Sequence, residues 1–381
     1  MTTKTKENWR TVRLADVVDI NACSVNSNFP YKEIEYIDIS AVGSGTLVGG
    51  LTEYKFSEAP GRARRLVKDG DIILSTVRPN RRSFLYIKNP RENTVASTGF
   101  AVLSPGPTTD SRFLYYLVTR QKFTDYLSAN AKGSAYPAVS SEVIADAEVL
   151  VPTYDEQKRI AGVLAAFDEK IENNNRIIKT LEEIAQMIFK EWFIDNPSNG
   201  EVISLTELAD FINGGAFGKI VHHTQKGLPL IKIAEFSRGI TEKTEWIDDV
   251  IPEKYLVKDG DLLFSWSGSL DLHIWHKGNA VLNQHLFNVI PKDSYTKGLL
   301  CVVLRSTLPW FRQIAQSKAT SIGHIQRHHL EEQKIVIPAN KDLSIFENFY
   351  QKLVSLMIEN QKLVAMRDLL LPKLMSGEVT I

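Results

Sequence analysis

Hydrophobic positions recur at steps of four and three residues along two stretches of the chain, which begin at Ile160 and Phe346. The first series is Ile160, Leu164, Phe167, Ile171, Asn174, Ile178, Leu181, Ala185, Ile188 and Trp192. The second, 186 positions later, is Phe346, Tyr350, Leu353, Met357, Asn360, Val364, Arg367, Leu371 and Leu374. A seam of this period over several heptads is typical of coiled coils. It predicts a long helix from Asp155 to about Phe193 and a second helix of the same kind.

One polar residue interrupts each seam at the same place. Asn174 and Asn360 each lie 22 residues beyond a proline, Pro152 and Pro338. If the two helices pack antiparallel about a pseudo-twofold axis, the two amides face each other near that axis. Such a polar pair fixes the register of the helices at some cost in stability. The alternative is that each Asn lies at the wet edge of a broad apolar face.

A six-residue segment, LVKDGD, occurs at Leu66–Asp71 and again at Leu256–Asp261, 190 positions later. Each copy precedes an apolar run, IILST in the first and LLFSW in the second. The Asp-Gly pair is typical of a tight turn, so we predict a turn capped by its aspartates and followed by a buried strand. The repeated hexamer is therefore interpreted as structural, and the diverged residues after it as functional.

The repeat continues on both sides of this segment. VRLADVVDI at Val12–Ile20 matches ISLTELADFI at Ile203–Ile212, and EVLVPTYDEQKRI at Glu148–Ile160 matches QKIVIPANKDLSIF at Gln333–Phe346. The chain is therefore predicted to be a tandem duplication of a module that ends in a strand, a proline and a helix. The predicted fold class is α+β, with two similar mixed α/β domains joined by two long antiparallel coiled-coil-like helices in a pseudo-twofold arrangement. The predicted boundaries are residues 1–153 for the first domain, 154–196 for the central helix, 197–340 for the second domain and 341–381 for the C-terminal helix.

Composition places the chain among cytoplasmic proteins. Its 381 residues are 43% hydrophobic, and 45 basic residues balance 45 acidic ones. The two cysteines, Cys23 and Cys301, lie in different modules and fit a reducing compartment better than a disulfide scaffold. The N-terminus has no apolar signal core, and no run approaches the ~18 apolar residues of a membrane span. We expect no membrane association.

Charge is concentrated locally in the first module. The stretch Gly61–Arg91 holds nine Lys and Arg residues against Asp69 and Asp71. Arginine dominates it, and the guanidinium fork reads guanine bidentately, so the stretch is suited to phosphates and base edges. The alternative is an ordinary solvated face.

The second module carries histidines in place of these arginines. All eight histidines of the chain lie between His222 and His329. They accompany no HExxH, CxxC or carboxylate at familiar ligand spacing, so we predict no metal site and interpret them as neutral donors toward bases or phosphate. ATP-binding and amino-methyltransferase signatures are absent as well, and no catalytic residue is predicted.

Four segments together carry a family resemblance. YDEQKRIAGVLAAFDEKIENNNRIIKTLEEIAQMIFKEWFID at Tyr154–Asp195 and LVAMRDLLLPKLMSGEV at Leu363–Val379 resemble the central and C-terminal shared regions of type I restriction-modification specificity subunits. The LVKDGD segments resemble the recurring frame of that family's target recognition domains. The resemblance covers essentially the whole chain.

The resemblance implies a non-catalytic, DNA-binding subunit of a multisubunit methyltransferase and endonuclease. Each recognition domain would read one half of a bipartite, asymmetric target in double-stranded DNA. The helix pair would set the gap, since ~40 residues at ~1.5 Å each span roughly 60 Å, more than one ~34 Å turn of DNA. The expected partners are two methyltransferase subunits and restriction/translocase subunits, which would carry S-adenosylmethionine, ATP and Mg²⁺; this chain would bind no cofactor. Two alternatives are a specificity subunit of a fused nuclease-methyltransferase and a coiled-coil scaffold without DNA.

Candidate DNA contacts come from the basic stretch and from the loops after the shared strand and before the last strand of each module. In the first module these are Arg62, Arg64, Arg65, Thr76, Arg78, Asn80, Arg81, Arg82, Lys132, Ser134 and Tyr136. In the second they are Trp266, Ser267, Ser269, His273, Thr320, Ser321, His324, Gln326 and Arg327. Predicted partner contacts on outward helix faces are Gln157, Arg159, Glu183, Lys190 and Trp192.

Overall fold

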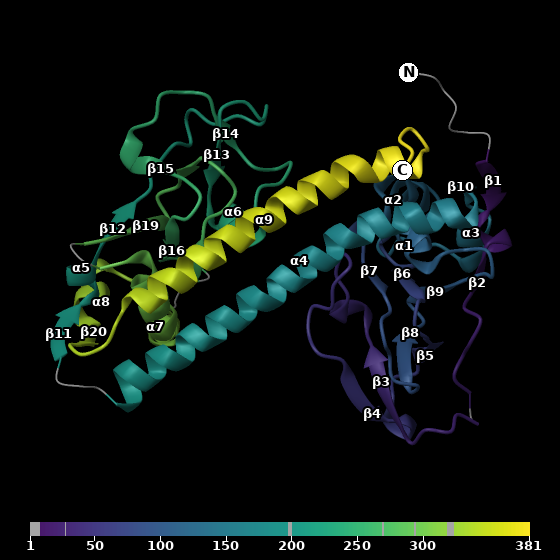
Figure 1. Ribbon diagram of the computed structural model, residues 1–381, viewed down its shortest axis with the longest axis horizontal. Helices are drawn as coiled ribbons and strands as arrows, with labels where there is room; N and C mark the ends of the chain where they lie inside the picture. The colour runs from purple at the N-terminus through teal and green to yellow at the C-terminus, as the bar shows by residue number, and fades with distance from the viewer. Residues whose placement is uncertain (1–7, 27, 197–199, 269, 293–294, 318–323) are drawn as a thin grey trace. The chain divides into compact units, whose positions relative to one another are not determined.

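The structure is a computed structural model that describes residues 8–26, 28–196, 200–268, 270–292, 295–317 and 324–381. The chain forms two compact units, of which the first combines Met1–Glu169 with Val364–Ile381 and the second is Lys170–Leu363. Each unit contains one globular module and part of each of two long helices (Figure 1). Both modules mix helices and strands, as predicted. No helix among the described residues is long and apolar enough to cross a membrane.

The first unit contains two four-stranded sheets and one strand pair. The first sheet has the order β2 (Val18–Ile20), β9 (Phe100–Pro105), β6 (Ile72–Ser75) and β7 (Phe84–Tyr86). The second has the order β4 (Thr52–Lys55), β3 (Glu33–Ile37), β8 (Thr94–Ser97) and β5 (Ala63–Leu66). β1 (Arg10–Arg13) pairs with β10 (Glu148–Val151). The helices of the module are α1 (Ser111–Thr119), α2 (Gln121–Ala129) and α3 (Ser141–Ala145).

Strand β6 is buried on both faces, which explains its continuous apolar sequence. Ile72 and Leu74 belong to a core that includes Phe113 of α1. Ile73, which points the other way, packs with Ile37 in the core between the two sheets. The first module is therefore built in layers, with α1 on one face of the β2-β9-β6-β7 sheet and the second sheet on the other.

The second unit repeats this strand order. One sheet has the order β12 (Ala209–Asn213), β19 (Leu286–Pro291), β16 (Leu262–Ser265) and β17 (Leu272–Ile274). The other has the order β14 (Trp246–Ile247), β13 (Leu228–Ile231), β18 (Ala280–Leu282) and β15 (Leu256–Val257). β11 (Gly200–Ser204) pairs with β20 (Lys334–Pro338). The helices are α5 (Leu205–Leu208), α6 (Ile233–Arg238), α7 (Lys297–Ser317) and α8 (Arg327–Glu332). The repeated strand order confirms that the two modules share one frame.

The LVKDGD segment forms the same turn in both units. Gly70 and Gly260 have positive φ angles of 83° and 82°, a conformation that glycine adopts without steric cost. The Lys68 N–H donates to Oδ2 of Asp71 at 2.9 Å, and the Lys258 N–H to Oδ2 of Asp261 at 2.8 Å. The second carboxylate oxygens differ: Asp71 accepts from the Ser104 hydroxyl at 2.7 Å, and Asp261 from the Lys297 ammonium at 2.7 Å. The predicted structural role of the hexamer is confirmed.

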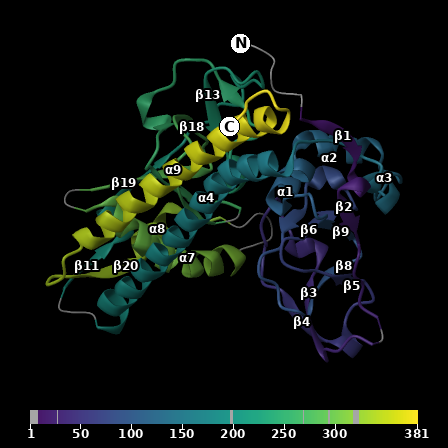
Figure 2. The ribbon, with the colours of Figure 1, turned by 45° about the vertical axis from the view of Figure 1, so that its right-hand side comes forward.

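Two long helices correspond to the two apolar seams. α4 spans Tyr154–Phe189 and continues as a π-helical turn at Lys190–Asp195, and α9 spans Ser344–Met375. All seam positions of α4 are buried or half-buried. Within the second unit Trp192 contacts Phe346 with ring centroids 5.9 Å apart, and Asn174 contacts Asn360, so the two helices run antiparallel there. Figure 2 shows the two ribbons side by side from a second direction.

The predicted contact between the two seam asparagines is confirmed. Asn174 has no solvent exposure, and its amide N–H₂ donates to Oδ1 of Asn360 and to Oε2 of Glu359, each at 2.9 Å. The Asn360 amide donates in turn to Oδ1 of Asn175 at 2.8 Å. Asn174 is therefore a buried polar residue of the seam, hydrogen-bonded to a half-buried Asn360 within the second unit.

Candidate functional site

Two segments of the first unit meet where the repeated frame ends. One is the loop after β6, and the other is the loop before α3. The Arg78 N–H donates to the Pro137 carbonyl at 2.7 Å, and the Val139 N–H to the Thr76 carbonyl at 2.9 Å. The backbones of Lys132 and Ala138 exchange two hydrogen bonds, of 2.8 and 2.9 Å, which close the second loop into a tight tip. The sequence placed these segments more than 50 positions apart, and main-chain pairing joins them.

Seven predicted DNA contacts lie on this paired structure. They are Thr76, Arg78, Asn80, Arg81, Lys132, Ser134 and Tyr136. The Tyr136 ring is 70% exposed, and the Arg78 guanidinium carbon lies 4.5 Å from its centroid. Thr76 is partly engaged, because its hydroxyl donates to the Gly99 carbonyl at 2.9 Å. We name these seven residues the first-unit tip.

The other predicted arginines are arranged differently. Arg82 donates to Gln121 and, at 2.8 Å, to the Thr119 carbonyl, so it ties the loop after β6 to the start of α2. Arg64 and Arg65 lie on strand β5, where Arg65 is half-buried and Arg64 donates to the Gly61 carbonyl at 3.2 Å. The Arg62 carbonyl accepts the Thr98 N–H at 2.8 Å. Arg82 and Arg65 were predicted to contact DNA. In the structure Arg82 holds two segments of the module together and Arg65 is half-buried, so neither presents a free guanidinium at the surface.

The second unit brings together the corresponding loops by the same pairing. Ser267 forms a backbone bridge with His324, and the Ile325 N–H donates to the Trp266 carbonyl at 3.0 Å. The Trp266 indole N–H donates to the Gln284 carbonyl at 3.2 Å, which fixes a half-buried ring beside this bridge. Trp266, Ser267 and His324 are thus equivalent in position to Thr76, Val77 and Ala138 of the first unit.

A cleft of about 400 Å³ lies within the second unit, and the exposed Arg327 is part of its wall. Lys254, Tyr255 and Asn213 also line it, with the Lys254 ammonium 4.9 Å from the Tyr255 ring centroid. Asp210 also lines the cleft, and its carboxylate lies 3.1 Å from the Lys292 ammonium. Two cationic side chains and an aromatic ring beside this neutralised carboxylate suit a phosphate or a base edge.

The remaining predicted residues of the second unit fall elsewhere. His273 lies on β17, with its ring 4.2 Å from that of Phe236 and its Nε2 3.4 Å from Asp271, whose pKa is lowered chiefly by this hydrogen bond. It therefore lies on an edge strand of the sheet rather than in the loop after the shared strand, where it was predicted. The exposed Gln326 precedes α8. Ser269, Thr320 and Ser321 lie outside the described residues.

The predicted partner contacts divide into two groups. Arg159, Glu183 and Lys190 are exposed, as expected. Gln157 is only 1% exposed, and its amide group binds the backbone of residues 108, 110 and 152, so its placement on an outward face was wrong. A distant loop covers this part of α4, which helical spacing alone does not reveal. Trp192 is half-buried against Phe346, with the Lys341 ammonium 5.2 Å from its ring, and it is mainly a packing residue.

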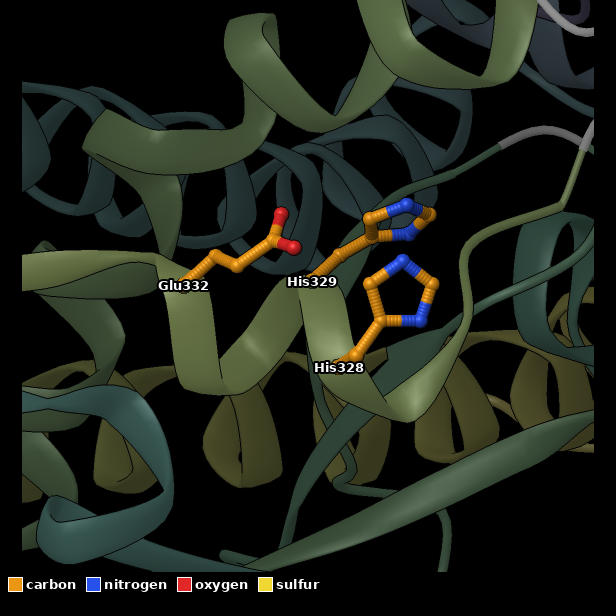
Figure 3. A group of neighbouring side chains, drawn as sticks. All are labelled: His328, His329 and Glu332. Carbon is orange, nitrogen blue, oxygen red and sulfur yellow. The ribbon is translucent and has the colours of Figure 1, made fainter.

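His328, His329 and Glu332 on α8 gather three potential metal ligands within 4.8 Å of one another (Figure 3). His329 is buried, and its Nδ1 accepts the Gln326 N–H at 2.9 Å. This bond places the proton of the neutral ring on Nε2, so neither ring nitrogen of His329 offers a lone pair to a metal. The donor set therefore fits a divalent metal poorly.

Several exposed residues at the second site were not predicted. Gln284 and His285 lie beside Trp266, with His285 Nδ1 3.4 Å from the Ser267 hydroxyl, and Lys254 lies in the cleft with Arg327. The signal for His285 was the run of histidines after β16. Lys254 had no local signal, because only the fold brings it to Arg327.

Comparison with known proteins identifies the frame that both units share. A family model described as the type I restriction modification DNA specificity domain matches residues 6–183 and 197–363. The chain belongs to this family. Two copies of the DNA specificity domain thus follow one another, and the predicted identity as a type I specificity subunit is confirmed.

Named relatives agree with this family. The type I restriction enzyme HindI specificity subunit of Haemophilus influenzae is 24% identical over 84% of this chain and 89% of its own length. The MjaIX specificity subunit of Methanocaldococcus jannaschii is 25% identical over 83% of this chain and 79% of its own length. The S subunit of a type I restriction-modification system from M. genitalium has the same fold, with a TM-score of 0.59, 16% identity and 98% coverage of both chains.

Proposed function

We propose that the two specificity domains of this chain read the two halves of one bipartite, asymmetric DNA target. The observation that carries this proposal is that both units pair the same two loops, with different side chains on each. In the first unit the loops present Arg78, Arg81 and Tyr136, and in the second Trp266 and His324. Two half-sites of different sequence require loops at equivalent places in the two domains that carry different side chains toward the bases.

The gap between the half-sites is proposed to be set by the helix pair. Residues 154–169 of α4 belong to the first unit and residues 170–189 to the second, so one continuous helix is shared by both domains. The contact between the buried Asn174 and Asn360 supports a single register, because a slip along the seam would break the hydrogen bonds of the Asn174 amide N–H₂ group. In this proposal α4 and α9 form an antiparallel, coiled-coil-like ruler with pseudo-twofold symmetry.

Methyltransferase subunits are proposed to bind exposed helix faces. Glu183, Met187, Lys190 and Ile194 follow one another at steps of four, three and four, so they share a helix face. All four are exposed, with Met187 at 62% and Ile194 at 58%. Exposed large apolar side chains flanked by charges are typical of a protein-binding surface.

The first unit has a comparable face on α9. Met366 and Leu369 are 52% and 63% exposed and lie three residues apart. One such face in each unit supports two methyltransferase subunits per chain.

The chain itself is proposed to be non-catalytic and cytoplasmic. S-adenosylmethionine, ATP and Mg²⁺ would be bound by the methyltransferase and restriction/translocase subunits, and adenine N6 would be the methylated atom. A fused nuclease-methyltransferase partner and a scaffold without DNA are the competing assignments.

Co-expression with the methyltransferase subunit of its own system tests the proposal. The complex should be isolated intact, and sequencing that detects N6-methyladenine should show one motif of two short blocks at a fixed gap. Methylation that depends on a single block contradicts the bipartite reading, and an intact complex without DNA binding favours the scaffold.

A matched pair of variants tests the proposed partner face. Met187→Glu places a charge on the exposed stripe and should prevent assembly, whereas Val250→Glu makes the same kind of change at a 93% exposed apolar residue outside the helix and should not. Equal assembly of both variants with the methyltransferase contradicts the assignment of this face.

A further inference from the structure

Arg78 adopts a backbone conformation that a non-glycine residue rarely takes. Its φ and ψ angles are 51° and 59°, in the left-handed region, where a Cβ atom is sterically unfavourable. The conformation is held by the pairing of the two loops, because the Arg78 N–H donates to the Pro137 carbonyl at 2.7 Å. The backbone at this position therefore favours glycine, and yet an arginine occupies it.

The second unit shows the residue that the backbone would favour. Ser267 bridges His324 as Val77 bridges Ala138, which makes Gly268 the structural equivalent of Arg78. Gly268 has a φ angle of 71°, so the same turn is left-handed in both units. The frame tolerates glycine here, and the arginine side chain of the first unit is not needed to form the turn. Its retention at a steric cost indicates a function for the side chain.

The Arg78 side chain is oriented by two contacts. Its guanidinium carbon lies 4.5 Å from the centroid of the Tyr136 ring, and its Nη2 donates to the Ala135 carbonyl at 3.1 Å. A guanidinium carries five N–H donors, so four are left after the bond to Ala135 among the described residues. Because Tyr136 is 70% exposed, the stacked pair lies at the surface, on the first-unit tip.

Other arginines of the basic stretch do not combine these properties. Arg82 also has a left-handed backbone, with a φ angle of 56°, but its guanidinium is tied to Thr119 and Gln121. Arg64 lies on strand β5. Arg81 is exposed on the same loop, in a helical turn whose geometry imposes no comparable backbone cost. A pre-oriented planar fork is suited to base reading, whereas mobile exposed charges are suited to phosphates.

We propose that Arg78 reads a guanine in the half-site bound by the first unit, with its fork directed at O6 and N7 of the base in the major groove and Tyr136 holding its plane. This inference rests on the proposed function, since it names one base of the target that the first unit reads. Two side chains then have separate roles: Arg78 contacts the base, and Tyr136 positions Arg78.

The test uses the complex with its methyltransferase and the motif read from N6-methyladenine sequencing. Arg78→Gly restores the residue that the second unit carries, so the variant should fold with an unchanged or higher melting temperature. Preference for guanine over other bases at one position of one block should fall by about 5- to 150-fold, while the other block and the gap stay the same. Arg78→Lys should relax the same position, because an ammonium keeps the charge and cannot bind guanine through a fork.

Two further variants separate the roles. Tyr136→Leu should weaken the same guanine preference by a smaller factor, and Arg13→Ala, at an exposed arginine that pairs with Asp16 outside the basic stretch, should leave the motif unchanged. A wild-type motif with no invariant guanine, or an Arg78→Gly variant that retains the wild-type motif, overturns the inference and leaves the bipartite function intact. Equal loss at all positions of the motif also overturns it, because that result identifies Arg78 as a phosphate contact. A wild-type complex that marks no motif contradicts the proposed function itself.

Discussion

Removal of the Asn174 side chain should weaken the helix pair locally, and the size of the effect follows from its contacts. The amide makes two hydrogen bonds of 2.9 Å, one to Asn360 and one to the Glu359 carboxylate. A neutral bond contributes about 0.5–1.5 kcal/mol and a bond to a charged group about 1.5–3 kcal/mol. Against this, the buried Oδ1 of Asn174 has no hydrogen-bond partner among the described residues, which already costs about 1–2 kcal/mol. Asn174→Ala should therefore destabilise the pair by about 1–3 kcal/mol.

The double variant provides the sharper comparison. Asn174→Leu alone leaves the Asn360 amide opposite an apolar side chain, whereas Asn174→Leu with Asn360→Leu removes both amides together and continues the apolar seam. Replacing both partners is commonly neutral or stabilising. The double variant should therefore be more stable than the sum of the two single variants predicts, by at least about 0.5–1 kcal/mol.

Native-state hydrogen exchange is the appropriate assay, because it reports the local free energy of opening for the amides of α4 and α9 in the whole chain. Asn173→Ala, at an exposed neighbouring position, is the matched control and should leave the exchange of α9 unchanged. Single and double variants that are simply additive would refute the reasoning, since they would show that the two amides do not depend on each other.

Three further predictions follow from particular contacts. Burial raises the pKa of Asp71 above its usual 3.8 despite the bond from Ser104, so the folded state binds a proton more tightly than the unfolded chain. This contribution to stability is present below about pH 4 and is lost as the pH rises through the folded pKa. In denaturant titrations, the free energy of unfolding of the wild type should fall relative to that of Asp71→Asn between acidic and neutral pH. A relative gain of the wild type would contradict the assignment. Arg82→Ala should release the loop after β6 from α2 and weaken DNA binding evenly across sequences in anisotropy titrations, whereas a change of specificity at one position would show that Arg82 reads a base. Zn²⁺ and chelators should leave the melting temperature of the second unit unchanged, since the Gln326 N–H occupies Nδ1 of His329, and a clear rise with Zn²⁺ would reveal a metal site.

The features that sequence predicted well depend on periodicity or identity. The seam from Ile160 to Trp192 required only the recurrence of apolar residues, and each of its positions on α4 is at least half-buried. The two LVKDGD turns were predictable because Asp-Gly specifies its own backbone geometry, with Gly70 and Gly260 both at positive φ.

The features that sequence did not predict depend on contacts between distant segments. Gln157 was predicted on an outward helix face, whereas the loop at residues 108–110 binds its amide group and buries it. The left-handed backbone of Arg78 had no local signal, since arginine does not indicate that conformation. An alignment of the two modules at an offset of 190 would have placed Arg78 against Gly268. It would have shown that the first module has an arginine where the second has a glycine.

The measurement that tests the central claim most directly is the dependence of binding on the gap between the two half-sites. Once the methylation motif is known, duplexes should be made with the native gap and with one base pair added or removed, which moves one half-site by ~3.4 Å along the axis and rotates it by about a tenth of a turn. If two domains read two blocks from a helix pair of fixed register, the assembled complex should bind the native gap at least about tenfold more tightly than either altered duplex. Equal binding to all three duplexes would contradict the account.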